Sequence, residues 1–188
     1  MLVGVSGKKG SFSEEAAEYY LKRIGKKNYR LLYLTSVENV LSALEREKID
    51  LGIFPIENSN GGIVYEAVEA MSRHNFNIKK FFEIDIQHCL LVLPQTLPQQ
   101  ITGIASHPQA LKQCRMYLKR KWPKMELIEW KDTALAAKNL AEGKMPSSTA
   151  VIAPERSAEL YNLDILESGI QDLKFNFTTF LAVEKRIN

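Results

Sequence analysis

The sequence is poor in the residues from which metal centres and disulfide frameworks are built. Its 188 residues include two cysteines and three histidines, and no pair of histidines has the spacing of zinc ligands. Because Cys89 and Cys114 lie in apolar or helical surroundings, we interpret them as reduced, buried thiols of a cytoplasmic protein. The net charge of +3 is too small to indicate a nucleic-acid partner. We therefore expect no metal site and no binding to nucleic acid.

Long hydrophobic runs and linkers are missing as well. No stretch approaches the roughly 20 apolar residues of a membrane-spanning helix, and the apolar run at 1–5 is too short for a signal peptide. The sequence contains no internal repeat, low-complexity tract or Gly/Ser-rich linker. The chain is long enough to bury a core, as one large or two small domains. These features predict a globular cytoplasmic protein without membrane contact.

Strand and helix patterns alternate along the chain. The first set is expected at 2–5, 13–24, 29–34, 37–44, 50–54 and 64–71. A long strand-like stretch at 78–93 follows, then a second set at 101–105, 109–118, 126–130, 133–141, 150–153 and 157–161, and a closing strand at 177–183. Such alternation predicts an α/β fold with parallel, helix-covered sheets. We expect two lobes, 1–77 plus 168–188 and 78–167, with a small-molecule cleft between them.

Residues 53–62 carry the first cluster of polar side chains. A buried strand is expected to end at Pro55, which cannot donate to a sheet ladder. Glu57, Asn58 and Ser59 follow directly and precede the next helix. Ligands of open α/β sheets bind at the carboxyl ends of strands, and helix N-termini attract anions. The same residues are also typical of a polar loop with a helix cap, so both interpretations stay open.

Three further clusters follow other expected strands. The loop at 7–13 combines glycines, hydroxyls and a helix start, which could hold an anion. Residues 106–109 lead into a helix on which Gln113 lies one turn further along the same face. Asn176 and Thr178 lie on one side of the last strand. Four clusters at comparable positions indicate a shared site more strongly than any one of them does.

Taken together, these clusters resemble the prephenate dehydratase family. The loop Gly7–Ser13 matches the family's Gly-x-x-Gly-(Thr/Ser)-(Phe/Tyr)-Ser, and Pro55–Ser59 matches Pro-Ile-Glu-Asn-Ser. His88–Leu91 is similar to a His-Cys-Leu-Leu strand, and Ser106–Cys114 matches Ser-His-Pro-Gln-Ala-Leu-x-Gln-Cys throughout. The resemblance covers residues 2–184 and includes an Asn-x-Thr-Arg-Phe element near the C-terminus.

The resemblance implies a cytoplasmic enzyme of phenylalanine biosynthesis with a two-lobed, periplasmic-binding-protein-like fold. Its reaction expels the ring hydroxyl and CO₂ from prephenate and leaves phenylpyruvate, with no metal or organic cofactor. It also implies a homodimer that associates through the catalytic lobes. Family members often continue into a phenylalanine-binding regulatory ACT domain, whereas this sequence stops at Asn188, so we expect no feedback inhibition by that route.

The family's motifs also suggest roles for individual side chains. Thr178 corresponds to the threonine linked to the leaving hydroxyl, and we expect a positioned hydrogen-bond donor because free threonine is a poor acid. Glu57 is expected either to take part in acid–base chemistry or to brace its loop. The residues expected to bind or position the substrate are Ser11, Asn58, Ser59, Ser106, Gln113 and Asn176.

One position departs from the family pattern in a way that bears on activity. Thr179 occupies the place of an arginine, which could grip a substrate carboxylate through two hydrogen bonds. Lys8 or Lys9 could replace the lost charge. The departure keeps three alternatives open: an arogenate dehydratase, a non-aromatising prephenate decarboxylase, and a non-catalytic module that binds small carboxylates.

Overall fold

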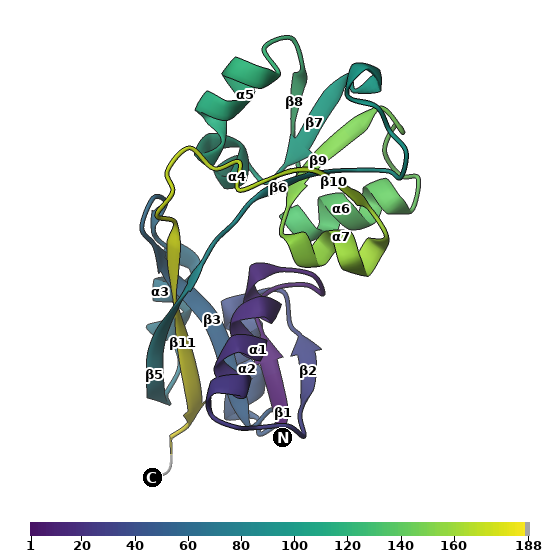
Figure 1. The fold of residues 1–188 in the computed structure, drawn as a ribbon. Helices are drawn as coiled ribbons and strands as arrows, with labels where there is room; N and C mark the ends of the chain where they lie inside the picture. Colours follow the sequence, from purple (N-terminus) through teal and green to yellow (C-terminus); the bar gives the residue numbers. More distant parts are fainter. Residues whose placement is uncertain (187–188) are drawn as a thin grey trace. The chain divides into compact units, whose positions relative to one another are not determined.

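The computed structural model describes residues 1–186, which divide into two compact units (Figure 1). The first unit holds residues 1–85 together with the strand that begins at Phe177, and the second holds residues 86–176. The sequence pattern places both boundaries earlier, at 77/78 and 167/168. They lie later because Phe76–Asp85 pairs with the last strand in the first sheet. Residues 169–176 belong to the second unit, where the Ile170 N–H donates to the His88 carbonyl.

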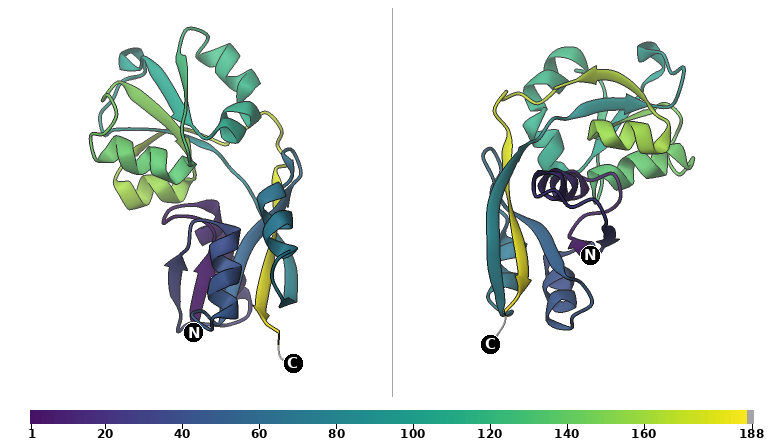
Figure 2. Two further views of the ribbon diagram at one scale, coloured as in Figure 1. Left: turned by 180° about the vertical axis from the view of Figure 1, so that it is seen from behind. Right: turned by 60° about the horizontal axis from the view of Figure 1, so that its bottom comes forward.

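The first unit contains a mixed, six-stranded sheet. Its strands are β1 (Leu2–Val5), β2 (Arg30–Tyr33), β3 (Leu51–Asn58), β4 (Gly62–Ile63), β5 (Phe76–Asp85) and β11 (Phe177–Lys185). The order is β2-β1-β3-β11-β5, with β4 paired to β3. β1 runs parallel to β2 and β3, as strand–helix alternation predicts, while β11 is antiparallel to both of its neighbours. β5 and β11 run side by side in all views (Figures 1 and 2).

Helices cover both faces of this sheet. They are α1 (Phe12–Arg23), α2 (Val37–Glu45) and α3 (Tyr65–Met71). On the α1 face, the Phe180 ring stacks on Phe82 at 5.9 Å, and Phe82 stacks on Tyr20 of α1 at 5.1 Å. On the other face, Leu181 and Val183 pack into the core formed with α2 and α3. Successive residues of β11 therefore point alternately toward α1 and toward α2 and α3.

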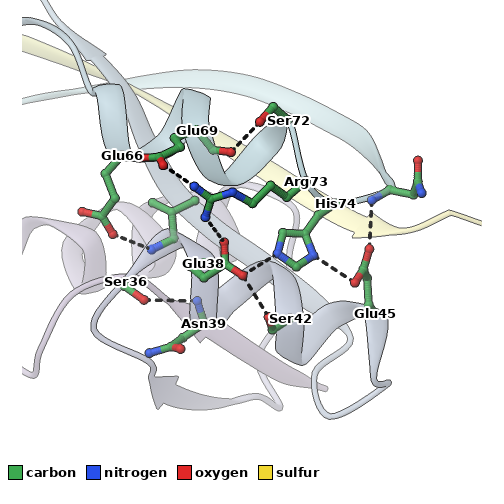
Figure 3. A network of polar contacts seen from close by, with 12 residues as sticks. Ser36, Glu38, Asn39, Ser42, Glu45, Glu66, Glu69, Ser72, Arg73 and His74 are labelled. Carbon is green, nitrogen blue, oxygen red and sulfur yellow. Dashed lines mark hydrogen bonds and ion pairs between the residues drawn. The ribbon is translucent and has the colours of Figure 1, made fainter.

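A polar network fastens α2 to α3 (Figure 3). Glu66 of α3 accepts the Val37 N–H at the start of α2 over 3.1 Å. Beyond α3, His74 Nε2 lies 2.8 Å from a carboxylate oxygen of Glu38. The other ring nitrogen, Nδ1, lies 2.9 Å from a carboxylate oxygen of Glu45. Burial lowers the pKa of His74, but the two carboxylates outweigh this effect and raise its pKa above the ordinary value. The imidazole thus bridges two points of α2.

The second unit has a five-stranded sheet of its own. Its strands are β6 (Cys89–Val92), β7 (Gly103–Ser106), β8 (Glu126–Glu129), β9 (Thr149–Ala153) and β10 (Asp164–Ser168), in the order β10-β6-β9-β7-β8. β7 is parallel to β8 and β9, whereas β6 is antiparallel to β9 and β10. β9 is buried on both faces, with Ala150 and Ile152 in one core and Val151 and Ala153 in another. An apolar run without polar alternation is typical of such a strand.

The helices of the second unit are α4 (Pro108–Gln113), α5 (Arg115–Lys121), α6 (Thr133–Ala141) and α7 (Glu155–Tyr161), with one 3₁₀ turn at Pro98–Gln100. The single helix expected at 109–118 is wrong, because the structure divides it at Cys114. The Asp172 carboxylate accepts the N–H groups of Met116 and Tyr117 at 2.8 and 2.9 Å, which begins a new helix. Among residues 1–186, no helix has both the length and the apolar character to cross a membrane.

The stretch expected as one strand at 78–93 is also divided. β5 ends at Asp85 and β6 begins at Cys89, and the residues between them carry the chain from one unit to the other. Cys89 and Cys114 are buried free thiols, as expected. Burial, assisted by the nearby Asp172 carboxylate, raises the pKa of the Cys114 thiol, which keeps it protonated.

Candidate functional site

Asn58 and Thr178 meet where β3 and β11 pair in the first unit. The Asn58 amide nitrogen donates to Thr178 Oγ1 over 2.9 Å. The Asn58 amide oxygen accepts the N–H groups of Asn60 and Gly61 at 3.0 and 2.7 Å. Because only the oxygen can accept those two donors, the orientation of the amide is fixed and its nitrogen must face Thr178. Asn58 therefore orients Thr178 directly.

The hydrogen of the Thr178 hydroxyl is not used in a hydrogen bond within the described residues. Its side chain is largely buried, with 8% of the residue exposed. Its oxygen accepts the hydrogen bond from Asn58, and no residue within 1–186 accepts the hydroxyl hydrogen. A buried hydroxyl normally uses its hydrogen. The arrangement thus leaves Thr178 ready to donate to a ligand.

Ser59 holds the beginning of β11 against the end of β3. Its N–H donates to the Phe177 carbonyl over 2.8 Å, and its hydroxyl oxygen accepts the Phe177 N–H over 3.0 Å. Asn58 adds a hydrogen bond of 3.1 Å from its amide to the same carbonyl. Ser59, expected to bind substrate, here fixes the backbone immediately before Thr178.

Thr179 lies on the opposite face of the sheet from Thr178. It stands directly across from Glu57 of β3 and from Glu83 of β5, and its hydroxyl donates to Glu83 over 3.3 Å. β11 continues without a bulge of its own from Thr178 to Leu181, so Thr179 shares the face of α2 and α3. An arginine at this position would meet two carboxylates of its own sheet.

The same strand pairing determines the place of Glu57 in the sheet. It pairs across from Thr179, whereas its neighbour Asn58 pairs across from Thr178. Its side chain is exposed, and directly opposite it on β4 stands Ile63. Of the two expected roles, this position favours bracing the β3–β4 turn over proton transfer beside Thr178.

The loop at 7–13 is fastened by a buried carboxylate. Ser11 caps α1 through its hydroxyl oxygen, which accepts the Glu14 N–H over 3.4 Å. The Glu14 carboxylate, on a residue only 2% exposed, accepts the Gly10 N–H and the Tyr33 hydroxyl, the latter at 2.6 Å. This resembles a capping box, with Tyr33 of β2 as an additional donor. Part of the expected anion cradle is therefore already occupied by the chain's own carboxylate.

Gly7 explains the tight path of this loop. A Cβ atom at Gly7 would lie 2.1 Å from the Ser11 hydroxyl oxygen and 2.9 Å from the Ser13 Cβ, so a larger residue would displace Ser11. Lys8 beside it is half-buried and Lys9 is exposed. The loop therefore carries positive charge close to Ser11.

In the second unit, Gln113 and Asn176 bond to each other. The Asn176 amide nitrogen lies 3.3 Å from the Gln113 amide oxygen and donates to the Ile86 carbonyl over 3.1 Å. The Gln113 oxygen also accepts from His88 Nε2 over 2.7 Å. Burial lowers the pKa of His88, an effect that the bond to Gln113 only partly offsets, so the imidazole is neutral. Both amides are thus engaged with the protein itself.

Ser106 is fully buried at the end of β7. Its hydroxyl donates to the Ile152 carbonyl of β9 over 2.6 Å. His107, rather than Ser106, caps α4, because its Nδ1 accepts the Gln109 N–H over 3.2 Å. Ser106, expected to bind substrate, uses its hydrogen to join two strands.

The described side chains at these positions are mainly hydroxyls and amides, which suit hydrogen bonding. Within residues 1–186, no group of three or more His, Cys, Asp or Glu side chains is placed to hold a metal ion. In the first unit the structure brings together Asn58, Ser59 and Thr178, with Ser11 in the loop before α1. In the second unit it brings together Gln113 and Asn176.

Sequence reasoning missed the residues that support these groups. The spacing of Ser11 and Glu14 is that of a capping box and could have identified the Glu14 carboxylate. Tyr33 and His88 gave no signal of their own, because each contact joins residues distant in sequence.

A family model described as "Prephenate dehydratase" matches residues 3–188 of the chain. Among curated proteins, "Arogenate dehydratase 5, chloroplastic" of Arabidopsis thaliana is 36% identical over 185 residues, covering 97% of this chain and 42% of that protein. "Arogenate dehydratase/prephenate dehydratase 6, chloroplastic", also of Arabidopsis thaliana, is 34% identical, with 97% and 43% coverage. The chain thus spans less than half the length of these relatives.

Solved structures agree with this match. A prephenate dehydratase from Arthrobacter aurescens in complex with L-Phe superposes with a TM-score of 0.89 at 26% identity, covering 100% of this chain and 61% of that one. Immunogenic lipoprotein A from Vibrio vulnificus reaches a TM-score of 0.51 at 16% identity, with 98% and 87% coverage. The second likeness concerns the fold alone, which is two-lobed and periplasmic-binding-protein-like, as expected.

Proposed function

The chain belongs to the prephenate dehydratase family, and we propose that it converts prephenate to phenylpyruvate, water and CO₂. The reaction breaks two bonds, which lie at different carbons of the ring. As the carboxylate leaves as CO₂, the electron pair of its C–C bond enters the ring, and the ring C–O bond breaks at the opposite carbon. The departing hydroxide takes up a proton and leaves as water. Because the product ring is aromatic, the substrate supplies much of the driving force.

One observation carries the proposal. Asn58 donates to Thr178 Oγ1 at 2.9 Å, and the fixed orientation of its amide leaves the Thr178 hydrogen available to a ligand. A hydroxyl set up in this way can donate to the leaving oxygen as negative charge develops on it. Threonine is too weak an acid to give up its proton outright, so Thr178 acts as the positioned donor while water completes the protonation.

The substrate is a dianion, and its carboxylates need positive potential. Lys8 and the start of α1 provide it beside Ser11, although Glu14 already occupies the Gly10 N–H. We propose that Lys8, which is half-buried, supplies positive charge to a substrate carboxylate. The expected positioning of substrate by Gln113 and Asn176, which bond to each other in the second unit, stays a prediction.

Arogenate is the second candidate substrate. It differs from prephenate in carrying an amino group in place of the keto group of the side chain. The names of two relatives that match this chain at 36% and 34% identity support it, because both are called arogenate dehydratases.

The expected homodimer and the expected cytoplasmic location stay predictions, and sedimentation of the purified chain tests the former.

The experiment is a direct assay of the purified chain with prephenate and with arogenate, in parallel. Phenylpyruvate and phenylalanine, respectively, are followed against controls without enzyme. We expect faster product formation from prephenate. Faster turnover of arogenate would identify the second candidate. Binding of either acid without turnover would favour the non-catalytic module, and a decarboxylated product that is not aromatic would identify the decarboxylase.

A further inference from the structure

His88 is a buried histidine to which the proposed reaction assigns no step. It lies between β5 and β6, where the chain enters the second unit, and only 3% of the residue is exposed. Its Nε2 lies 2.7 Å from the Gln113 amide oxygen, which also receives the Asn176 amide at 3.3 Å. The side chain therefore adjoins the two amides that the sequence singles out in this unit.

A backbone carbonyl sets the direction of each hydrogen bond in the network that links His88, Gln113 and Asn176. The Ile86 carbonyl can only accept, so the Asn176 group that faces it at 3.1 Å is the amide nitrogen. The same nitrogen donates to Gln113, which fixes the Gln113 oxygen as an acceptor. His88 must then donate to that oxygen, so its hydrogen resides on Nε2. Because the imidazole is neutral, Nδ1 carries no hydrogen.

The network ends at the segment that leads to the proposed hydrogen-bond donor. The Ile86 N–H donates to the Asn176 carbonyl over 2.6 Å, so Asn176 is tied to Ile86 through both its backbone and its side chain. Asn176 is fully buried and directly precedes Phe177, the first residue of β11. Thr178 follows within that strand. The hydrogen-bond network of His88 therefore ends at Asn176, two residues before Thr178.

We propose that His88 is a positioning residue, which through the hydrogen on Nε2 orients Gln113 and Asn176 and so fixes the place where β11 begins. The inference rests on the proposed function, because it assigns His88 to the placement of Thr178. His88 itself touches neither substrate nor leaving group. A displacement of about 1 Å in a reacting group can lower a rate by about 10²-fold, so such support affects turnover.

The first test compares two substitutions at His88. His88→Leu replaces the imidazole with an apolar side chain that has no hydrogen-bond donor. His88→Gln instead places an amide N–H near the position of Nε2. We expect His88→Leu to lower kcat at least about tenfold with a smaller change in KM, and His88→Gln to recover most of the loss. Equal kcat for both variants, or wild-type kcat for His88→Leu, would overturn the proposal.

A matched control separates positioning from general stability. The Tyr117 hydroxyl donates to Glu167 over 2.8 Å, elsewhere in the second unit. The same hydroxyl accepts the Trp122 Nε1–H over 3.1 Å. Tyr117→Phe therefore removes two hydrogen bonds and should lower Tm at least as much as His88→Leu while leaving kcat unchanged. An equal fall in kcat in Tyr117→Phe would mean that His88 acts only through the stability of the unit.

A second measurement does not depend on catalysis. In ¹⁵N NMR spectra, His88 should show the neutral Nε2–H tautomer, and His88→Leu should shift the side-chain amide signals of Gln113 and Asn176. An Nδ1–H tautomer, or unchanged amide signals, would overturn the network. If the wild-type chain turns over neither prephenate nor arogenate, the proposed function fails, whereas these spectra still decide whether His88 orients the two amides.

Discussion

Asn58 donates a hydrogen bond of 2.9 Å to the Thr178 hydroxyl oxygen and is itself held by the N–H groups of the turn that follows it. The relationship makes Asn58 a residue that orients Thr178, while its expected contact with substrate stays a prediction. Its consequence is chemical, because a hydroxyl whose oxygen already accepts a hydrogen bond is free to turn its hydrogen toward a ligand.

Asn58→Asp tests this orientation. The new carboxylate keeps an acceptor for the Asn60 and Gly61 N–H groups but accepts the Thr178 hydrogen instead of donating to its oxygen. We expect kcat to fall about 10²-fold, with a loss of about 0.5–1.5 kcal/mol in stability because the Phe177 carbonyl loses one of its two donors. Steady-state kinetics and denaturant unfolding measure both. Asn60→Asp adds the same charge to the same turn and should leave kcat close to that of wild type.

Thr179→Arg tests whether the departure from the family pattern affects substrate binding. Because Thr179 stands between Glu57 and Glu83 on the face away from Thr178, the arginine should pair with those carboxylates. Cross-strand pairs of opposite charge contribute about 0.2–1 kcal/mol each, so Tm should rise, less so at high salt. We expect kcat/KM to stay within about twofold, far below the tenfold that 1.4 kcal/mol represents. A tenfold or larger gain would show that an arginine at position 179 reaches the substrate.

Tyr33→Phe tests the support of the loop at 7–13. The substitution removes one of the donors to the buried Glu14 carboxylate. Hydrogen bonds to charged groups contribute about 1.5–3 kcal/mol, so the free energy of unfolding should fall by about that amount. KM should rise more than kcat falls if, as we propose, the loop binds a substrate carboxylate and not the leaving group. Tyr19→Phe provides the control, since the Tyr19 hydroxyl accepts from Arg23 at an exposed site. An unchanged stability in Tyr33→Phe would mean that Glu14 does not depend on this donor.

The raised pKa of His74 predicts that the free energy of unfolding depends on pH. The Glu38 and Glu45 carboxylates raise the pKa of His74 in the folded chain above the unfolded value of 6.5, in spite of the opposing effect of burial. The stabilisation from His74 is therefore fully present below about pH 6.5 and is lost as pH rises through the folded pKa. Chemical unfolding of wild type and His74→Gln between pH 5.5 and 9, at about unit intervals, should give a difference that shrinks toward alkaline pH.

Arg73→Gln serves as the control for that series. Arg73 contacts Glu38 and Glu69 in the same network but does not titrate in this range. Its substitution should change stability by a similar amount at every pH. A difference between wild type and His74→Gln that is constant across the series, or that grows toward alkaline pH, would contradict the bridging role of His74.

The sequence predicts elements whose causes are local. The apolar strand at 150–153 and the helix that starts near residue 13 each depend on neighbouring residues, so both are recognisable without a structure. The break at Cys114 is different, because it depends on the distant Asp172 carboxylate. The mixed character of the first sheet is likewise non-local, since it requires β11 to enter between β3 and β5.

The same distinction applies to the candidate site. Motif resemblance identified the positions of Asn58, Ser59 and Thr178, and the structure brings these residues together. It could not assign the direction of their hydrogen bonds, which depends on the Asn60 and Gly61 backbone. Nor could it place Thr179 on the opposite face, because that follows from the register between β3, β11 and β5.

The turnover of Thr178 variants tests the central claim most directly. Thr178→Val keeps the shape of the side chain and removes the hydroxyl, and Thr178→Ser keeps the hydroxyl. With the better of prephenate and arogenate as substrate, we predict that Thr178→Val lowers kcat by about 10²–10⁴ while Thr178→Ser stays within about tenfold of wild type. Both variants should remain folded, as judged by their thermal transitions. A Thr178→Val variant with wild-type kcat would contradict the account, since the reaction would then proceed without the donor that Asn58 orients.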